Sequence, residues 1–150
     1  MSYDSSLPLN HKIIETTNSS VQNVSNSSAE ITGSKIDYNF SSGSFVIYKF
    51  SFYMDCDGSY TASVFELETS TDDSTWNHIT GYSFLIGDDR ASENQKTNIN
   101  IFFVIPVSSV SRYLRIVGYS KTAATSFTLF QSEFEGTDRY INSILEVFTI

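Results

Sequence analysis

The sequence predicts an all-β protein, an antiparallel β-sandwich of about eight to ten strands in which a jelly roll is favoured over an immunoglobulin-like topology. From residue 35 onward, apolar residues recur with a period of two. Polar turns separate these segments at intervals of roughly 8–12 residues, as in sandwiches. Phe, Trp and Tyr make up 15% of the chain, and such rings fill a core from few positions. No helix is predicted beyond a short turn near residues 108–111.

The longest alternating segment predicts a strand that ends at residue 55. Its apolar positions are Val46, Tyr48, Phe50 and Phe52. Asp and Gly in residues 55–58 supply turn chemistry. A second strand over residues 60–69 is therefore expected to complete an antiparallel hairpin with the first.

The remaining strands follow from the same alternation. The polar stretch at residues 87–94 predicts an exposed loop, and Pro106 ends a strand or confines it to a sheet edge. The further strands are expected over residues 76–81, 82–86, 97–107, 112–117, 126–134 and 140–150.

Two regions are predicted, an N-terminal extension or arm over residues 1–30 and the sandwich over residues 31–150. Ser, Asn and Thr dominate residues 17–29, and their side chains compete for backbone hydrogen bonds. Only residues 11–15 of the extension have the pattern of a strand. The extension is expected either to lie over another surface or to fray.

Charge argues against two classes of partner. The chain has 9 Lys and Arg against 17 Asp and Glu, a net charge of −8. Such a chain repels nucleic-acid phosphates and anionic membrane surfaces. No apolar run approaches the roughly 20 residues of a spanning helix. We therefore expect no nucleic-acid partner and no membrane partner.

The N-terminal residues and the cysteine content indicate the compartment of synthesis. The first thirty residues lack the positive charge and apolar run of a secretory signal. The single Cys56 cannot form an internal disulfide, and no activating base for a nucleophilic role can be assigned to it. Synthesis in a cytoplasm is expected, with stability that comes from packing or assembly.

Catalytic and cofactor motifs are not recognised in the sequence. His11 and His78 lie in no motif, and no cluster has the spacing of zinc ligands. The seven glycines are scattered singly, so no phosphate-binding loop is predicted. Asp55 and Asp57 before Gly58 resemble the start of a calcium loop, but the later ligands of an EF-hand are missing, which leaves a calcium site of another type as the alternative. We predict a protein that is not an enzyme and that has no cofactor and no metal site.

Two pairs of acidic residues are candidates for the catalytic carboxylates of a glycosidase, which act in pairs about 5–10 Å apart. They are Asp72 with Asp73 and Asp88 with Asp89. Both pairs lie in turn-like sequence, where Asp commonly bonds to its own backbone. Solvated turns are the favoured interpretation.

Aromatic side chains on strands offer an alternative, non-catalytic chemistry. A ring face stacks on the apolar face of a sugar while a nearby Asp or Asn bonds to hydroxyls. Trp76, Tyr82 and Tyr119 are the candidates, although aromatic strand residues belong to a core more often.

Two segments carry a resemblance to known proteins. Residues 62–76 contain the pattern L-x-x-S-x-D-x-S-x-W, and residues 112–117 read RYLRIV. Together they are similar to virion proteins of tailed bacteriophages and to some discoidin-like modules. With the acidic charge and the polar N-terminal segment, they resemble small capsid decoration, cement or fibre proteins. That resemblance implies a trimeric jelly roll that is made in a host cytoplasm and located in the virion.

The leading functional hypothesis is therefore a non-enzymatic structural protein of a virus particle, a decoration or cement protein that binds the shell as a homotrimer. Its partners would be the major capsid protein or other virion proteins. The alternative is a carbohydrate-binding or adhesion module of a tail or receptor-binding protein, with a glycan as partner. The expected assembly residues are Ile13, Ile14, Leu145, Phe148 and Ile150, and the ligand-binding residues of the alternative are Trp76, Tyr82, Asp88 and Asp89.

Overall fold

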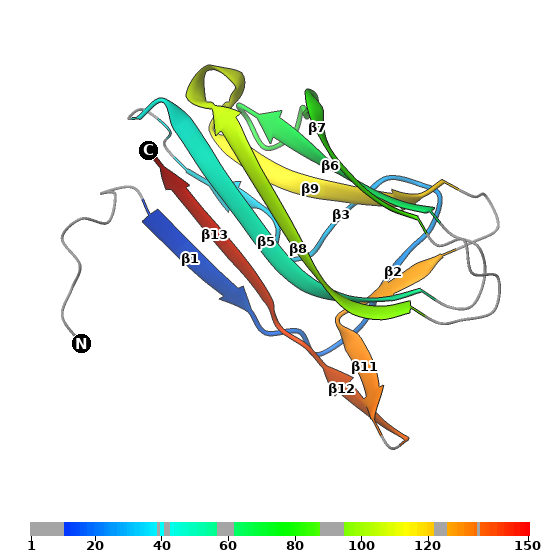
Figure 1. Cartoon of the computed structure of the whole chain (residues 1–150). Helices are drawn as coiled ribbons and strands as arrows, with labels where there is room; N and C mark the ends of the chain where they lie inside the picture. Colours follow the sequence, from blue (N-terminus) through cyan, green and yellow to red (C-terminus); the bar gives the residue numbers. More distant parts are fainter. Residues whose placement is uncertain are drawn as a thin grey trace, which may run out of the picture.

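Two antiparallel sheets packed face to face form the body of the computed structural model (Figure 1). The structure describes residues 11–38, 40, 43–56, 62–87, 95–121, 126–134 and 136–150. Within these residues the chain forms thirteen strands, several of them only two to four residues long, and one 3-10 turn, η1 (Val107–Ser109). The turn lies in the stretch where the sequence predicts one.

The first sheet, sheet A, is organised around β5 (Phe45–Cys56). One edge of β5 pairs along its whole length with β8 (Gln95–Pro106). The other edge pairs first with β13 (Ser143–Thr149) and further along with β10 (Phe127–Leu129). Two short strands complete the sheet, β1 (His11–Thr16) beside β13 and β2 (Gln22–Val24) beside β10.

The second sheet, sheet B, is organised around β9 (Tyr113–Ser120) and β6 (Ala62–Ser70), which pair with each other. β7 (Asn77–Gly87) lies beyond β6, and a bulge interrupts their pairing between Glu66 and Glu68. The other members pair with β9, namely β3 (Ala29–Glu30) and β4 (Ile36–Asp37).

The order of the strands is that of a jelly roll. If β3 and β4 are taken as one interrupted strand, the eight principal strands among the described residues are β1, β3/β4, β5, β6, β7, β8, β9 and β13. Sheet A then has the order first, eighth, third and sixth, and sheet B has the order second, seventh, fourth and fifth. This arrangement confirms the predicted fold class, a double-sheet antiparallel sandwich.

The predicted hairpin between β5 and β6 is wrong. β5 belongs to sheet A and β6 to sheet B, so the chain crosses from one sheet to the other between them. Phe52 of β5 and Phe65 of β6 face each other across the core, with ring centroids 5.2 Å apart. Two strands joined by a turn have the same inward alternation whether they pair or face each other, so periodicity does not distinguish these arrangements.

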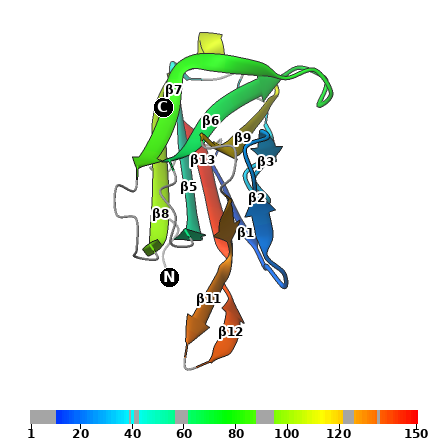
Figure 2. The ribbon, with the colours of Figure 1, turned by 90° about the vertical axis from the view of Figure 1, so that its right-hand side faces the viewer.

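Strand boundaries differ from expectation at two bends. The strands expected over residues 76–81 and 82–86 are one strand, β7, which is bent near Gly81. The strand expected over residues 126–134 is split at Phe130, which has a positive φ of 71°. Beyond Phe130, β11 (Gln131–Phe134) and β12 (Thr137–Tyr140) form a hairpin that projects from the body (Figures 1 and 2).

Residues 11–30, the described part of the predicted extension, follow the sandwich closely. They contribute β1, β2 and β3, which pair with β13, β10 and β9 respectively. Glu30 continues into Ile31, which is fully buried and bonds to the Ile116 carbonyl. The boundary at residue 30 stays a prediction.

The core is a chain of aromatic contacts that passes between the sheets. Phe52 packs on Phe50 of its own strand and on Phe65 of sheet B, and Phe65 packs in turn on Phe127 of sheet A. Gly118 of β9 makes room for this packing. A Cβ at residue 118 would lie 2.9 Å from the Ile31 side chain and 3.1 Å from the Phe65 ring.

One buried polar side chain makes the fold sensitive to alkali. Tyr48 is completely buried and donates its hydroxyl hydrogen to the Ser34 carbonyl. Burial raises the pKa of Tyr48 well above its ordinary value of 10.0. The unfolded chain releases this proton near pH 10 and the folded chain retains it, so stability falls as the pH rises above that value.

We expect the free energy of unfolding to decrease above about pH 10, by up to about 1.4 kcal/mol per pH unit for this one proton. Tyr48→Phe removes the titrating group and should flatten that decrease, while loss of the hydrogen bond costs about 1–2 kcal/mol at neutral pH. Urea unfolding between pH 8 and 11 measures both effects. Equal slopes for the two proteins would contradict this role of Tyr48.

Candidate interaction surface

The outer face of sheet A has an apolar half at the end where the chain terminates. Register places side chains there in rows across the strands, for example Phe148, Ile47 and Val104. Ile150 and Phe45 exchange backbone hydrogen bonds in the next row. We define the apolar half as Phe45, Ile47, Phe102, Val104, Phe148 and Ile150.

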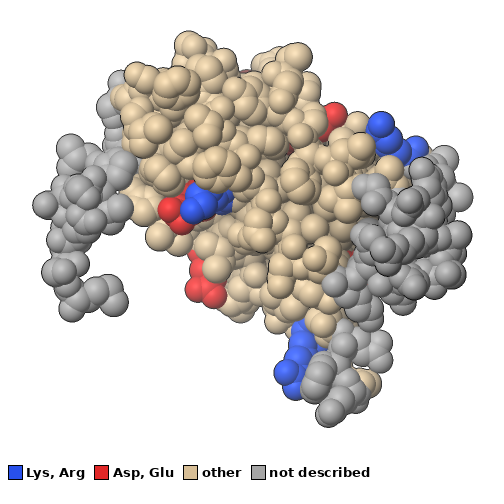
Figure 3. Space-filling model, viewed as in Figure 1, with Lys and Arg blue, Asp and Glu red and all other residues tan. Residues whose placement is uncertain are grey.

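Several of these side chains are strongly exposed. Phe102 is 58% exposed, and Phe45 and Val104 are each 42% exposed. The face over β1, β13, β5 and β8 is mostly uncharged in Figure 3. Contiguous exposed apolar side chains commonly mark a surface that another molecule covers. This half of the sheet is therefore suited to contact with a protein.

The charged side chains beside the apolar half are paired with each other among the described residues. Glu146 lies 3.2 Å from His11 Nε2 and 3.9 Å from Lys49 Nζ, both from neighbouring strands. Ile13, 62% exposed, lies opposite Glu146 in the register of β1 and β13. A partner that covered this face would meet a nearly neutral surface on a strongly acidic chain.

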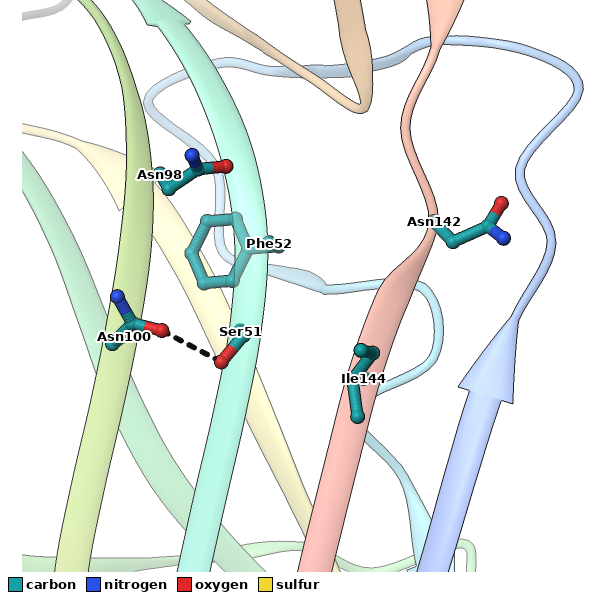
Figure 4. Close-up of a pocket in the computed structure, with 6 residues that line it drawn as sticks. All are labelled: Ser51, Phe52, Asn98, Asn100, Asn142 and Ile144. Atoms are coloured by element: carbon teal, nitrogen blue, oxygen red, sulfur yellow. Dashed lines mark hydrogen bonds between the residues drawn. The ribbon is translucent and has the colours of Figure 1, made fainter.

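The outer face of the same sheet becomes polar toward the other end of β8. Alternate residues of a strand share one face, so Asn98 and Asn100 lie on the same outer face of β8 as Phe102 and Val104. Here β13 gives way to β10 as the neighbour of β5, and an open hollow of about 310 Å³ lies at this point (Figure 4). We define the amide half as its lining without the buried Phe52, namely Ser51, Asn98, Asn100, Asn142 and Ile144.

The amides of this half differ in how they are bonded. Ser51 Oγ donates to Asn100 Oδ1 over 2.7 Å. Asn142 is engaged on both sides, as acceptor from the Asn18 backbone and as donor to Glu15. The Asn98 side chain and Asn100 Nδ2 have no partner among the described residues. These groups are available to a ligand.

The expected assembly residues lie in three different environments. Ile13, Phe148 and Ile150 belong to the outer face of sheet A. Ile14 projects from the opposite side of β1, beside its register partner Leu145. Leu145 is fully buried in the core, so its side chain adds no exposed surface. A role of the exposed residues in assembly stays a prediction.

The residues expected to bind a sugar are not gathered in the described structure. Trp76 lies at the outer face of sheet B, with Arg115 Cζ 4.0 Å from its ring centroid. Tyr82 packs edge-on against Phe103 of β8, with ring centroids 5.7 Å apart. Asp88 and Asp89 lie outside the described residues. One face of the Trp76 ring is already occupied by the guanidinium.

Arg115 links three segments of sheet B. It contacts Glu68 of β6 at 2.8 Å and Glu30 of β3 at 3.0 Å while it stacks on Trp76. The two sequence segments that resemble virion proteins, residues 62–76 and 112–117, therefore pack together around one side chain. This packing gives a structural reason for both motifs.

The acid pair Asp72 and Asp73 stabilises a turn. Hydrogen bonds from the backbone of Thr75 and then of Ser74 hold the pKa of Asp72 well below its ordinary value of 3.8. Asp73 bonds to Lys35 at 3.1 Å. The observed bonds are those expected of acids in a solvated turn.

Metal-binding residues do not cluster in the part of the chain that the structure describes. No group of three or more His, Cys, Asp or Glu residues is placed there to hold an ion. His11 lies at sheet A, whereas His78 lies beside Glu66 at sheet B. The side chain of Cys56 and residues 57–58 of the calcium-like segment are outside the described structure. No helix within the described ranges is long and apolar enough to cross a bilayer.

Sequence reasoning missed the amide half, although a signal for it exists. In the strand from residue 97 to 107, the polar residues Asn98 and Asn100 and the apolar residues Phe102 and Val104 share one face. That division is visible in the sequence. The contributions of Ser51, Asn142 and Ile144 depend on strand order, which the alternation does not provide.

Comparisons with known proteins identify no family for the chain. No family model and no curated protein matches it. Among solved structures, two of infectious bursal disease virus, from the Gx and Gt strains, have a TM-score of 0.45 with 9% and 10% sequence identity. They cover 99% of this chain, which spans 36% and 37% of their lengths.

Arg115 of β9 and Arg112, the residue before β9, together provide a test of the Arg115 cluster. Arg115→Met leaves Glu30 and Glu68 without their shared cation in a half-buried site, so we expect a loss of roughly 1–3 kcal/mol in unfolding free energy. Arg112→Met is the matched control. Arg112 also forms an ion pair, with Asp37, and also stacks on a ring, but it is exposed. Exposed pairs contribute little, so its loss should be smaller. Urea unfolding of both variants measures the difference, and equal losses would contradict the assignment.

Proposed function

We propose that this chain is a non-enzymatic structural protein of a virus particle, which associates with other virion proteins through the outer face of sheet A. The observation that carries the proposal is the apolar half. Its exposed rings and aliphatic side chains extend over adjacent strands, whereas isolated exposed apolar residues are ordinary in any protein. A surface of this kind is stabilised when another protein covers it.

The virion assignment is supported by two further features. The segments that resemble phage virion proteins pack on each other around Arg115, so the resemblance covers a structural unit. The jelly roll is also an architecture that viral capsid domains use. Because lectin domains use it too, the fold supports the proposal without deciding it.

The specific role that we propose is capsid decoration or cement by a homotrimer. Each protomer would contribute a modest contact to the shell, and several linked copies would bind far more strongly than one. The outer face of sheet A is the surface proposed for protein contacts. The strands of residues 11–30 pair within the chain, so we assign the shell contact to the outer face of sheet A, to which Ile13 of β1 belongs, and not to a free arm.

A non-enzymatic role is consistent with the arrangement of the acids and histidines. The best-defined carboxylate, Asp72, is engaged by backbone N–H groups of its own turn. His11 and His78 lie at different sheets, so they do not form one catalytic group. Binding is the activity that the exposed surfaces support.

Substitution of Phe102 tests the role of the apolar half in assembly. We expect the wild-type protein to form a stable oligomer, a trimer under the specific proposal. Phe102→Asp should convert it to monomers, because a charge in the middle of an apolar contact is costly to desolvate. Leu85→Asp is the matched control, since Leu85 is equally exposed, at 58%, but lies on β7 of sheet B. Light scattering measures the masses.

A monomeric wild-type protein at every concentration, or equal dissociation by both variants, would contradict assembly through the apolar half.

The assignment to a virus particle is tested by a separate measurement. Peptides of the chain should occur in purified virus particles in fixed proportion to the shell protein, measured by quantitative mass spectrometry. Their loss during particle purification would contradict a structural role.

A further inference from the structure

The hollow of the amide half has the properties of a binding site for a neutral sugar. Its volume of about 310 Å³ lies at the lower end of the range for small-molecule sites, about 300–1,000 Å³. It is lined by Ser51, Phe52, Asn98, Asn100, Asn142 and Ile144, none of which is charged. It opens at the outer surface, where a saccharide can enter without a change in the fold.

Hydrogen-bonding capacity is the first feature that selects the ligand. An Asn side chain has two N–H donors and one acceptor oxygen. The whole Asn98 amide and the donors of Asn100 Nδ2 have no partner among the described residues, whereas Asn100 Oδ1 is held by Ser51 at 2.7 Å. Both side chains project from β8 toward β5 (Figure 4). Hydroxyl groups, which both donate and accept, match this mixture.

The spacing of the two amides suits an extended ligand. Asn98 and Asn100 are two residues apart on one strand, which corresponds to roughly 6.5–7 Å along it. Hydrogen bonding of Asn100 to Ser51 fixes one amide in orientation before a ligand binds. Two anchoring points at this separation can reach hydroxyls at different positions of one ring or of adjacent rings.

Apolar side chains beside the amides provide the complementary contact. Ile144, at 45% exposure, lies in the lining, and the half-buried Tyr53 is the register partner of Asn98 on the same face. A sugar ring has apolar C–H faces as well as hydroxyls, and such faces pack on aliphatic and aromatic groups. A purely polar ligand, such as an inorganic ion, would leave these side chains unused.

Charge decides between neutral and anionic sugars. No Lys or Arg is among the described residues that line the hollow, and the chain as a whole has a net charge of −8. The acidic chain disfavours a carboxylate, phosphate or sulfate on the ligand, and the described lining supplies no cation to bind one. We propose that the amide half binds a neutral oligosaccharide, held by the Asn98 and Asn100 amides with Ile144 of the lining, and Tyr53 outside it, against its C–H faces.

The site can be tested by direct observation of the amides. Side-chain NH₂ signals of the ¹⁵N-labelled protein are followed while lactose, mannobiose or diacetylchitobiose is added, with sialyllactose as the charged counterpart of lactose. We expect the Asn98 and Asn100 signals to shift with at least one neutral sugar and to shift less with its charged form. Asn77, exposed on β7, is the control and should not respond.

Asn98→Ala and Asn100→Ala should each weaken binding of that sugar by roughly tenfold, the equivalent of one lost hydrogen bond to a ligand. Asn77→Ala should leave the affinity unchanged. The Phe102→Asp variant should keep sugar binding even as a monomer, which separates this site from the proposed assembly surface. The inference is overturned if no neutral sugar shifts the two signals, if the Ala variants bind as wild type, or if an extended neutral peptide shifts them and the sugars do not.

Discussion

Packing of the Phe65 ring between Phe52 and Phe127 is the contact on which the rest of the structure depends. Phe65 belongs to sheet B and its two neighbours belong to sheet A, with centroid distances of 5.2 and 5.6 Å. The contact therefore joins the sheets at the middle of the core. The Phe65 ring needs the space beside its register partner Gly118 on β9, because a side chain at residue 118 would collide with Phe65 or Ile31. Loss of this packing would remove the ring contacts that join the two sheets at this point.

The orientation of β5 follows from this contact and determines the candidate surface. With Phe50 and Phe52 fixed in the core, alternation places Ile47, Lys49 and Ser51 on the outer side of the sheet, where Ile47 is itself covered by its neighbours and only 5% exposed. The register with β8 then sets Val104, Phe102 and Asn100 beside them in that order. The division of the outer face into an apolar half and an amide half is thus a consequence of strand register. A shift by one residue would exchange the buried and exposed sets.

Local periodicity predicted the fold class and most strands, because each strand has one buried face. It could not predict which strands pair, and the β5–β6 hairpin failed for that reason: Phe52 and Phe65 face each other across the core instead of sharing a sheet. The candidate site depends on the same missing information. Phe148 and Ile150 could be selected from the sequence, but Leu145 could not be assigned to the core and Ser51 could not be brought to Asn100 without strand order.

The two outer faces of the sandwich differ in how many of their side chains already have a partner within the chain. On sheet B, Arg115 lies against Trp76 and neutralises Glu30 and Glu68, so the central groups already have partners. On sheet A, Phe102 and Val104 remain exposed, and Asn98 has no partner among the described residues. A bound molecule would gain more binding free energy on sheet A, where it would bury exposed apolar area and form hydrogen bonds with the unpaired amides. This asymmetry is the physical reason to place both protein and sugar contacts on the same sheet, at opposite ends of β8.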